Sequence, residues 1–438
     1  MLLFRQFVDE DLGCASYLVG DSAGGRAVVI DPALAIEQYV SAAADAGVRI
    51  ERVLETHTHA DHVSGHGRFA IEHELPVAIH SLAEPEYPFE PLADGDDLEL
   101  GAARIRVLHT PGHRPEHCAF VVDERIVLTG DSLFIGDAAR PDLAIAAREG
   151  AHDLFQSLER LTALGDDVAV YPGHVAGSLC GANMSADRSS TIGQERRSNA
   201  ALKFRDIQEF VLESASLATP RPPTTERVVA INRGAWLAQP AEPDELDGTD
   251  SATVLDVRPF AAYSAGHVPG AINVPESAGS FGTRAGFVLV PGEPVCLHAS
   301  SRDEALAAAR KLWAVGVLDL AGYVTRPPAP ETLAAVDVAE LKRLIDETDV
   351  QVVDVRESYE RDEGYIAGST NIPFRLLRKL GAGSLERSRP VVTVCESGAR
   401  ATIAASLLRR DGFDVRAVAD GGVATFDGDV VSFRRCGG

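Results

Sequence analysis

The stretch Thr56-His57-Thr58-His59-Ala60-Asp61-His62 decides the fold, because it places three imidazoles and one carboxylate within seven residues. It follows the apolar run Arg52-Val53-Leu54, which is typical of the end of a buried strand, and precedes a stretch of helical spacing. Side chains on such a turn converge on one point. Imidazole and carboxylate together favour zinc, iron or manganese over magnesium or calcium. A solvated turn with Asp61 as helix cap would need one such residue and not four.

The composition indicates a soluble multidomain protein. With 438 residues the chain is long enough for two to three domains, and 45% hydrophobic with 24% charged residues is ordinary for globular proteins. The net charge of -24 argues against nucleic acid or an anionic membrane as the main partner. No apolar run is long enough to span a membrane, and the acidic run at residues 9–11 comes too early for a signal peptide. The six scattered cysteines favour free thiols in the cytoplasm.

Short strand-like runs alternate with helical stretches in the first half of the chain. A Gly-containing turn at residues 24–25 predicts a hairpin over residues 16–31, and helices are expected near residues 34–46 and 69–74. This pattern favours two packed sheets covered by helices over a helical bundle. Further strands are expected at residues 77–79, 105–108, 119–122 and 126–128. Pro-rich connectors are expected at residues 218–223 and 326–330.

The second half contains an internal repeat. Val254-Leu255-Asp256-Val257-Arg258 matches Val352-Val353-Asp354-Val355-Arg356, and Asn273 matches Asn371, both at a spacing of 98 (354 − 256 and 371 − 273). A shared spacing is much harder to obtain by chance than a shared composition. The sequence therefore predicts two copies of one open α/β domain.

Three later residues extend the histidine cluster. His113 ends Thr110-Pro111-Gly112-His113, Asp131 ends Thr129-Gly130-Asp131, and His174 ends Tyr171-Pro172-Gly173-His174. With the opening cluster, this ordered series resembles the metallo-β-lactamase superfamily over roughly residues 1 to 230. The resemblance implies an αββα sandwich with a metal site at one edge of its sheets.

Two chemistries of that superfamily compete for the same residues. In a hydrolase, two Zn²⁺ ions per chain would generate hydroxide and polarise a carbonyl, as for a thioester or lactone. The ligands would be His57, His59 and His113 for one ion, Asp61, His62 and His174 for the other, and Asp131 as the bridge.

In the other chemistry, His57, His113 and Asp131 form a two-histidine, one-carboxylate face that holds one Fe²⁺ per chain. Open positions would then receive oxygen and substrate. The residues left to orient the ligands would be His59, Asp61, His62 and His174. The motif alone leaves both chemistries open.

Neighbouring residues resemble the persulfide dioxygenase branch. Gly130-Asp131-Ser132-Leu133-Phe134 is followed by Arg140-Pro141-Asp142. Arg140 is expected either to bind an anionic substrate or to brace its loop. In the same resemblance, Cys180 lies near the oxygenase pocket, as a persulfide relay or as a structural thiol.

The second repeat contains a candidate nucleophile. The strand-like run Val392-Thr393-Val394 leads into Cys395-Glu396-Ser397-Gly398-Ala399-Arg400 and then a helical stretch. Backbone N–H groups and the helix dipole at such a turn stabilise a thiolate. With the repeat landmarks, this copy resembles a rhodanese domain, which implies that Cys395 carries a persulfide and that Arg400 closes the loop.

The first repeat is predicted to be inactive. A spacing of 98 puts Leu297 at the nucleophile position and keeps an arginine at Arg302. Leucine cannot carry sulfur. Cys296 lies one residue earlier, on a strand and facing inward, so this copy is interpreted as a domain for docking or spacing.

The whole chain resembles multidomain persulfide dioxygenase–sulfurtransferases of sulfide detoxification. We expect a dioxygenase domain over residues 1–235, an inactive rhodanese-like domain over 236–329 and an active rhodanese domain over 330–438. The implied reactions oxidise a low-molecular-weight thiol persulfide with O₂ to sulfite and thiol, and then transfer sulfur to the sulfite to give thiosulfate. A homo-oligomer is expected, with no nucleic acid partner and no membrane span.

Overall fold

The computed structural model describes residues 1–141, 146–175, 185, 187–216, 220–249, 252–326 and 330–432. The chain divides into two compact units. The first consists chiefly of Met1–Arg221 and Thr225–Pro240, and the second chiefly of Ala241–Leu312 and Val317–Gly438.

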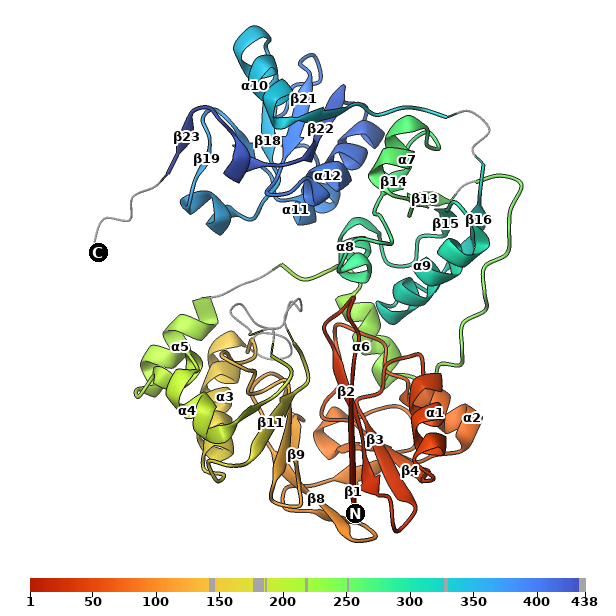
Figure 1. Cartoon of the computed structure of the whole chain (residues 1–438), viewed down its shortest axis with the longest axis vertical. Helices are drawn as coiled ribbons and strands as arrows, with labels where there is room; N and C mark the ends of the chain where they lie inside the picture. Colours follow the sequence, from red (N-terminus) through yellow and green to blue (C-terminus); the bar gives the residue numbers. More distant parts are fainter. Residues whose placement is uncertain are drawn as a thin grey trace. The chain divides into compact units, whose positions relative to one another are not determined.

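Two six-stranded sheets form the first unit (Figure 1). The first sheet has the order β1(Leu2–Val8), β2(Ala15–Asp21), β3(Arg26–Ile30), β4(Arg49–Leu54), β5(Val77–His80), β6(Glu90–Leu92). The second has the order β12(Ser190–Thr191), β11(Ala169–Pro172), β10(Ile126–Gly130), β9(Cys118–Val122), β8(Ala103–His109), β7(Asp97–Leu100). Strands β2 and β3 pair antiparallel, so the predicted hairpin is confirmed.

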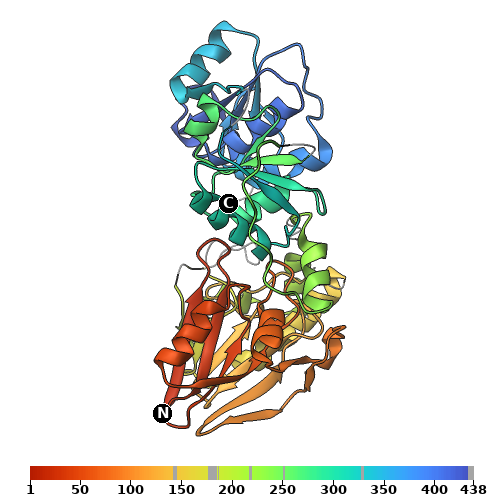
Figure 2. The same ribbon diagram turned by 90° about the vertical axis from the view of Figure 1, so that its right-hand side faces the viewer.

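The two sheets pack face to face, and helices cover their outer faces. Tyr17 and Ile30 of the first sheet share one buried cluster with Ile105 and Phe120 of the second. Figure 1 shows α1 and α2 outside the first sheet and α3, α4 and α5 outside the second, and Figure 2 shows both sheets turned by 90°. The helices are α1(Glu37–Asp45), α2(His66–His73), α3(Ala147–Thr162), α4(Ile192–Ser198), α5(Ile207–Ser216) and α6(Thr225–Arg233). The predicted αββα sandwich is therefore confirmed.

The second unit contains two parallel sheets, one for each repeat. The first sheet has the order β14(Ile272–Asn273), β13(Thr253–Asp256), β15(Val295–His298), β16(Leu320–Val324), with helices α7(Phe260–Ala265), α8(Phe281–Val288) and α9(Arg302–Ala314). The second has the order β17(Ala335–Asp337), β22(Val415–Asp420), β21(Val391–Val394), β18(Gln351–Asp354), β20(Thr370–Asn371), with helices α10(Val338–Glu347), α11(Phe374–Leu380) and α12(Ala399–Arg410). A short pair, β19(Tyr365–Ile366) and β23(Val430–Val431), completes it.

The matched sequence landmarks make matched contacts in the two copies. Arg356 binds both carboxylate oxygens of Asp354, and the Asn371 amide donates to the carbonyl oxygens of residues 354 and 356. Arg258, Asp256 and Asn273 repeat these contacts in the first copy. Because both copies make these contacts, the contacts serve the fold and not a site in one copy. We call the set of Asp, Arg and Asn contacts in each copy the latch.

The prediction of Leu297 at the nucleophile position is wrong. His298 pairs with Asp256 as Val394 pairs with Asp354, so the register in this part of the repeat is 96 (394 − 298). Ala299 therefore takes the place of Cys395, and Glu304 takes the place of Arg400. The first copy still has no sulfur nucleophile at this position, because alanine cannot carry sulfur either.

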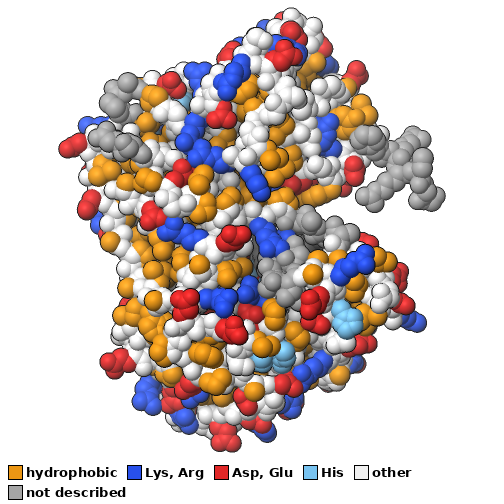
Figure 3. Space-filling model, turned by 180° about the vertical axis from the view of Figure 1, so that it is seen from behind, with side chains coloured by type: hydrophobic (Ala, Val, Ile, Leu, Met, Phe, Trp, Pro, Cys, Tyr) orange, Lys and Arg blue, Asp and Glu red, His pale blue; other side chains and the backbone are white. Residues whose placement is uncertain are grey.

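Acidic and basic side chains are interspersed on the face drawn in Figure 3, so the large negative net charge does not gather there in one patch. Among the described residues, no helix is both long enough and apolar enough to cross a bilayer.

Candidate metal centre and persulfide loop

Four loops bring the predicted ligands to one edge of the sandwich. The histidine cluster follows β4 in the first sheet, while Asp131 and His174 follow β10 and β11, which run parallel in the second sheet. His113 lies in the loop between β8 and β9. The carboxyl ends of neighbouring parallel strands meet at the same edge, which brings residues distant in sequence together.

Three ligand atoms converge here. The ligand atoms of His57, His113 and Asp131 all lie within 4.8 Å of one another, and all three side chains are buried. Nε2 of His57 and Oδ2 of Asp131 are buried with no hydrogen-bond partner among the described residues. Nε2 of His113 lies 3.5 Å from that Oδ2, a separation that suits two ligands of one ion about 2.1 Å away. Unpaired buried polar atoms are costly, so these residues fit a metal ion.

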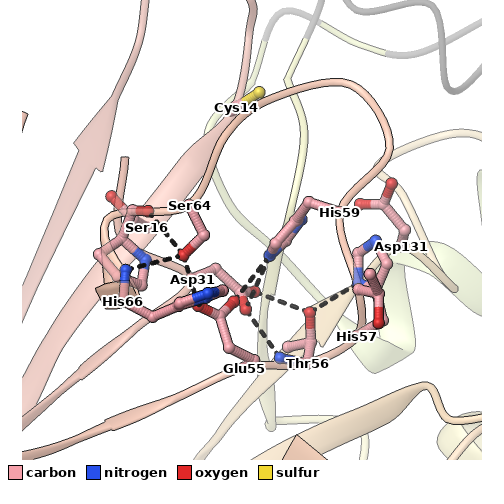
Figure 4. A network of polar contacts seen from close by, with 12 residues as sticks. Cys14, Ser16, Asp31, Glu55, Thr56, His57, His59, Ser64, His66 and Asp131 are labelled. Carbon is pink, nitrogen blue, oxygen red and sulfur yellow. Dashed lines mark hydrogen bonds and ion pairs between the residues drawn. The ribbon is translucent and has the colours of Figure 1, made fainter. Parts of the chain in front are cut away.

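A hydrogen-bond chain fixes the orientation of His57 (Figure 4). The Thr56 hydroxyl donates to Oδ2 of Asp31 at 2.8 Å, which leaves its oxygen to accept the Nδ1 proton of His57 at 2.9 Å. Asp31 Oδ1 also accepts the Thr56 backbone N–H at 2.7 Å. With the proton on Nδ1, the Nε2 lone pair of His57 is available to a metal.

The other two ligands are oriented in the same way. Nδ1 of His113 donates to the Arg140 carbonyl oxygen at 3.0 Å, so its Nε2 faces the site. Oδ1 of Asp131 lies 2.7 Å from Nδ1 of His174, and the Asp131 backbone N–H donates to Nε2 of His117 at 2.9 Å. Asp131 therefore has one oxygen left for a metal. Arg140 contributes to the site through its backbone.

Burial keeps the ligand imidazoles neutral. Burial and the neighbouring imidazoles of His59 and His113 hold the pKa of His57 well below its usual value. Burial also lowers the pKa of His113, although Asp131 opposes this, and burial with His113 lowers the pKa of His117 to about 3. Neutral imidazole is the form that binds metal.

The remaining members of the cluster are held by carboxylates or by a thiol. Nε2 of His59 lies 3.0 Å from Glu55 and 3.2 Å from Asp31, which raise its pKa despite burial. Nε2 of His174 lies 2.7 Å from Oδ2 of Asp61. The Cys14 thiol approaches that same oxygen at 3.2 Å and that same nitrogen at 3.3 Å. Burial raises the pKa of Cys14, with Asp61 adding to the effect, so this thiol is held in its protonated form.

Replacing Thr56 by valine is expected to weaken metal binding about 10- to 100-fold, the usual cost of losing a group that orients a ligand. Valine keeps the shape and removes the hydroxyl between Asp31 and His57. The measurement is a metal titration against a competing chelator. Thr56→Ser keeps the hydroxyl and serves as the control; equal affinity in the valine variant would contradict the role given to this hydroxyl.

The predicted sulfur carrier lies in the second copy, where β21 ends and α12 begins. Cys395 is 1% exposed, and its Sγ accepts the Gly398 N–H at 3.1 Å. Gly398 has φ of +90°, and a Cβ there would lie 2.4 Å from the Ala419 carbonyl oxygen. The turn therefore requires glycine. Ser397 is exposed, and Ala399 is the first residue of α12.

Two carboxylates hold the arginines of this loop. Arg400 donates to both oxygens of Glu360, at 2.5 and 2.8 Å. Arg356 donates to Oε2 of Glu396 at 3.3 Å.

In the first copy, Cys296 is fully buried on β15, and burial raises its pKa to about 11. Its thiol is therefore protonated, unlike a sulfur nucleophile.

Sequence reasoning did not single out several of these residues. The signals were present for two of them: Asp31 directly follows the strand β3, and His117 is spaced four residues after His113. The sequence pattern assigns no role to Thr56, and Glu360 lies outside the sequence motifs described above. The predicted site residue Cys180 lies outside the described residues.

Two family models match three parts of the chain. The metallo-beta-lactamase superfamily model matches residues 9–174, and the rhodanese-like domain model matches residues 236–325 and 337–428. A metallo-beta-lactamase from Staphylococcus aureus is 31% identical with a TM-score of 0.70, covering 74% of this chain and 99% of that one. The fold and site thus define a metalloprotein of the metallo-β-lactamase type that carries two rhodanese-like domains.

Named relatives fall in two classes. The human persulfide dioxygenase ETHE1 is 29% identical over 248 residues, which are 55% of this chain and 91% of the relative. The hydroxyacylglutathione hydrolase of Francisella tularensis subsp. novicida is 31% identical over 176 residues, which are 40% of this chain and 68% of the relative. The chain belongs to the metallo-β-lactamase superfamily, and the predicted resemblance to persulfide dioxygenases fused to rhodanese domains is confirmed. These relatives support an enzyme with a bound metal.

Proposed function

We propose that the first domain uses one Fe²⁺ to oxidise a low-molecular-weight thiol persulfide, and that Cys395 then transfers sulfur to the product sulfite. In the first reaction, persulfide, O₂ and water give thiol, sulfite and protons. In the second, a sulfane sulfur on Cys395 moves to sulfite and gives thiosulfate. The domain bounds 1–235, 236–329 and 330–438 are part of the proposal, as are a cytoplasmic location, a role in sulfide detoxification and a homo-oligomeric state.

The observation that carries the proposal is the single free oxygen of Asp131. With Oδ1 of Asp131 engaged by His174 at 2.7 Å, this carboxylate presents only Oδ2 to a metal, as a terminal ligand does. Two imidazoles and one terminal carboxylate are the ligands of non-haem iron oxygenases. Bound Fe²⁺ would supply open positions at which O₂ and the persulfide meet. The relative's name, persulfide dioxygenase, supports the same substrate class.

The chain's own residues prepare this chemistry. Thr56, Arg140 and His174 hold the three ligands in place. Burial of the three ligand side chains keeps them fixed in the packed interior around the site. A site for a second zinc ion is supported by two further groups of converging ligand atoms, His59 with Asp61 and His62, and Cys14 with Asp61 and His174. Nδ1 of His59 and of His62 is also buried with no hydrogen-bond partner among the described residues. That alternative is a hydrolase of thioesters or lactones with two Zn²⁺ per chain.

Removing the metal tests the choice between these functions. Chelation is expected to abolish oxygen uptake on a thiol persulfide, and Fe²⁺ is expected to restore it where Zn²⁺ does not. Oxygen consumption and metal content are measured on the same sample. An active form with two zinc ions, little iron and no oxygen uptake would overturn the dioxygenase proposal in favour of the hydrolase.

A further inference from the structure

Glu360 holds Arg400 at the mouth of the Cys395 loop. Both oxygens of the carboxylate accept from the guanidinium, at 2.5 and 2.8 Å, in the parallel geometry that an oxyanion would also adopt. Oε2 of Glu360 also accepts the Glu357 backbone N–H at 2.9 Å, which anchors the carboxylate in the short 3₁₀ helix Ser358–Asp362. The face of the guanidinium that its two terminal nitrogens form, which could bind an oxyanion in the same way, is therefore already occupied.

Arg400 is also a neighbour of the nucleophile. It is the second residue of α12, the helix that follows the turn carrying Cys395. Although burial opposes it, Glu360 raises the pKa of Arg400, and the charge of Cys395 acts in the same direction. Any anion that reaches the sulfur of Cys395 therefore comes within the field of this arginine.

A comparison of the two copies distinguishes residues that the fold requires from residues that occur only with the Cys395 nucleophile. The first copy keeps the latch of Asp256 and Arg258 but has Ala262 at the position of Glu360, at the spacing of 98. It has Glu304 at the position of Arg400, where its carboxylate accepts the Ser300 N–H at 2.5 Å. The carboxylate–guanidinium pair is thus lost together with the cysteine, in a domain that folds without it.

We propose that Glu360 competes with an oxyanion acceptor of the Cys395 sulfur, because it occupies Arg400 until the oxyanion takes its place. This inference rests on the proposed function. The sulfur lone pair of sulfite attacks the outer sulfur of the Cys395 persulfide, the sulfur–sulfur bond breaks, and its electron pair leaves on the Cys395 thiolate. Thiosulfate departs, and total charge is unchanged. Arg400 offsets the repulsion between the two anions once Glu360 releases it.

Glu360→Gln in the full-length chain tests the proposal. Glutamine keeps one oxygen, which can accept from the Glu357 N–H and from Arg400, and it removes the competing charge together with the second acceptor. The protein is loaded with sulfur from a thiol persulfide under anaerobic conditions and then mixed with sulfite or with a neutral, water-soluble tertiary phosphine, which accepts a sulfane sulfur without carrying a charge. The half-saturating sulfite concentration is expected to fall about 3- to 5-fold, the upper part of the range for a partly exposed ion pair. The rates at saturating sulfite and with the phosphine are expected to stay unchanged.

Glu363→Gln removes an exposed carboxylate three residues away and serves as the matched control. A parallel change with both acceptors would overturn the proposal, because it would show that Glu360 only positions Arg400. An unchanged sulfite dependence would overturn it as well. Loaded wild-type protein that gives no thiosulfate would sink the proposed sulfur transfer and this inference together, whereas the two preceding outcomes leave the sulfur transfer intact.

Discussion

Replacing Asp131 by asparagine is expected to lower oxygen consumption on a thiol persulfide more than about 100-fold, beyond the usual cost of losing an orienting group. Asparagine keeps the shape and presents an amide where Oδ2 now faces Nε2 of His113 at 3.5 Å. The site then has two neutral imidazoles and no charge to offset that of the ion. Oxygen uptake and bound iron, measured on the same purified sample, are expected to fall together.

The control must separate loss of the metal from loss of the fold. Asp131 is 1% exposed and also binds His174, so its variant needs a check of unfolding temperature. Asp45→Asn changes an exposed carboxylate at the end of α1 and should match the wild type in both measurements. A folded Asp131→Asn protein with full iron content and full oxygen uptake would show that this carboxylate is not a ligand.

The convergence of the candidate ligands was predictable, because the carboxyl ends of parallel strands lie at one edge of a sheet. His57, Asp131 and His174 each follow a short apolar run, which is typical of a buried strand. A residue that directly follows such a strand lies at the carboxyl edge of the sheet. The hydrogen bonds behind the ligands were not predictable, because they join residues far apart in sequence. Asp31 reaches Thr56 across 25 positions, and His117 reaches the Asp131 amide across 14. Only the pairing of β3 with β4 and of β9 with β10 brings these groups within 3 Å.

The error at Leu297 has a similar cause. The repeat keeps a spacing of 98 as far as Asn273 and Asn371, but the next paired strands are spaced by 96 (391 − 295). The first copy thus has two more residues between β14 and β15, in the segment that contains α8. Loops tolerate such insertions without disturbing the strands they connect. The pairing of the strands in the structure shows this change of spacing. The sequence landmarks do not, because they all lie before the insertion.

Replacing Cys395 by serine is expected to reduce thiosulfate formation to below about 1% of the wild-type level, because a hydroxyl cannot replace the thiolate that carries the sulfane sulfur. Serine fits the buried position and still accepts the Gly398 N–H that now reaches Sγ at 3.1 Å, so the turn should persist. Oxygen uptake should be unchanged, since the metal ligands are elsewhere. Sulfite and thiosulfate, quantified after persulfide oxidation, should show sulfite accumulating in proportion to the oxygen consumed.

The first copy supplies the matched control for this substitution. Cys296→Ser removes a thiol that is equally buried, on the equivalent strand, but three residues before the nucleophile position held by Ala299. Thiosulfate should persist in that variant. Undiminished thiosulfate from Cys395→Ser would mean that another thiol, or sulfite reacting directly with free persulfide, carries the sulfur. A loss in both variants would point instead to the two copies acting as one unit, since a buried thiol far from the loop cannot take part in the transfer itself.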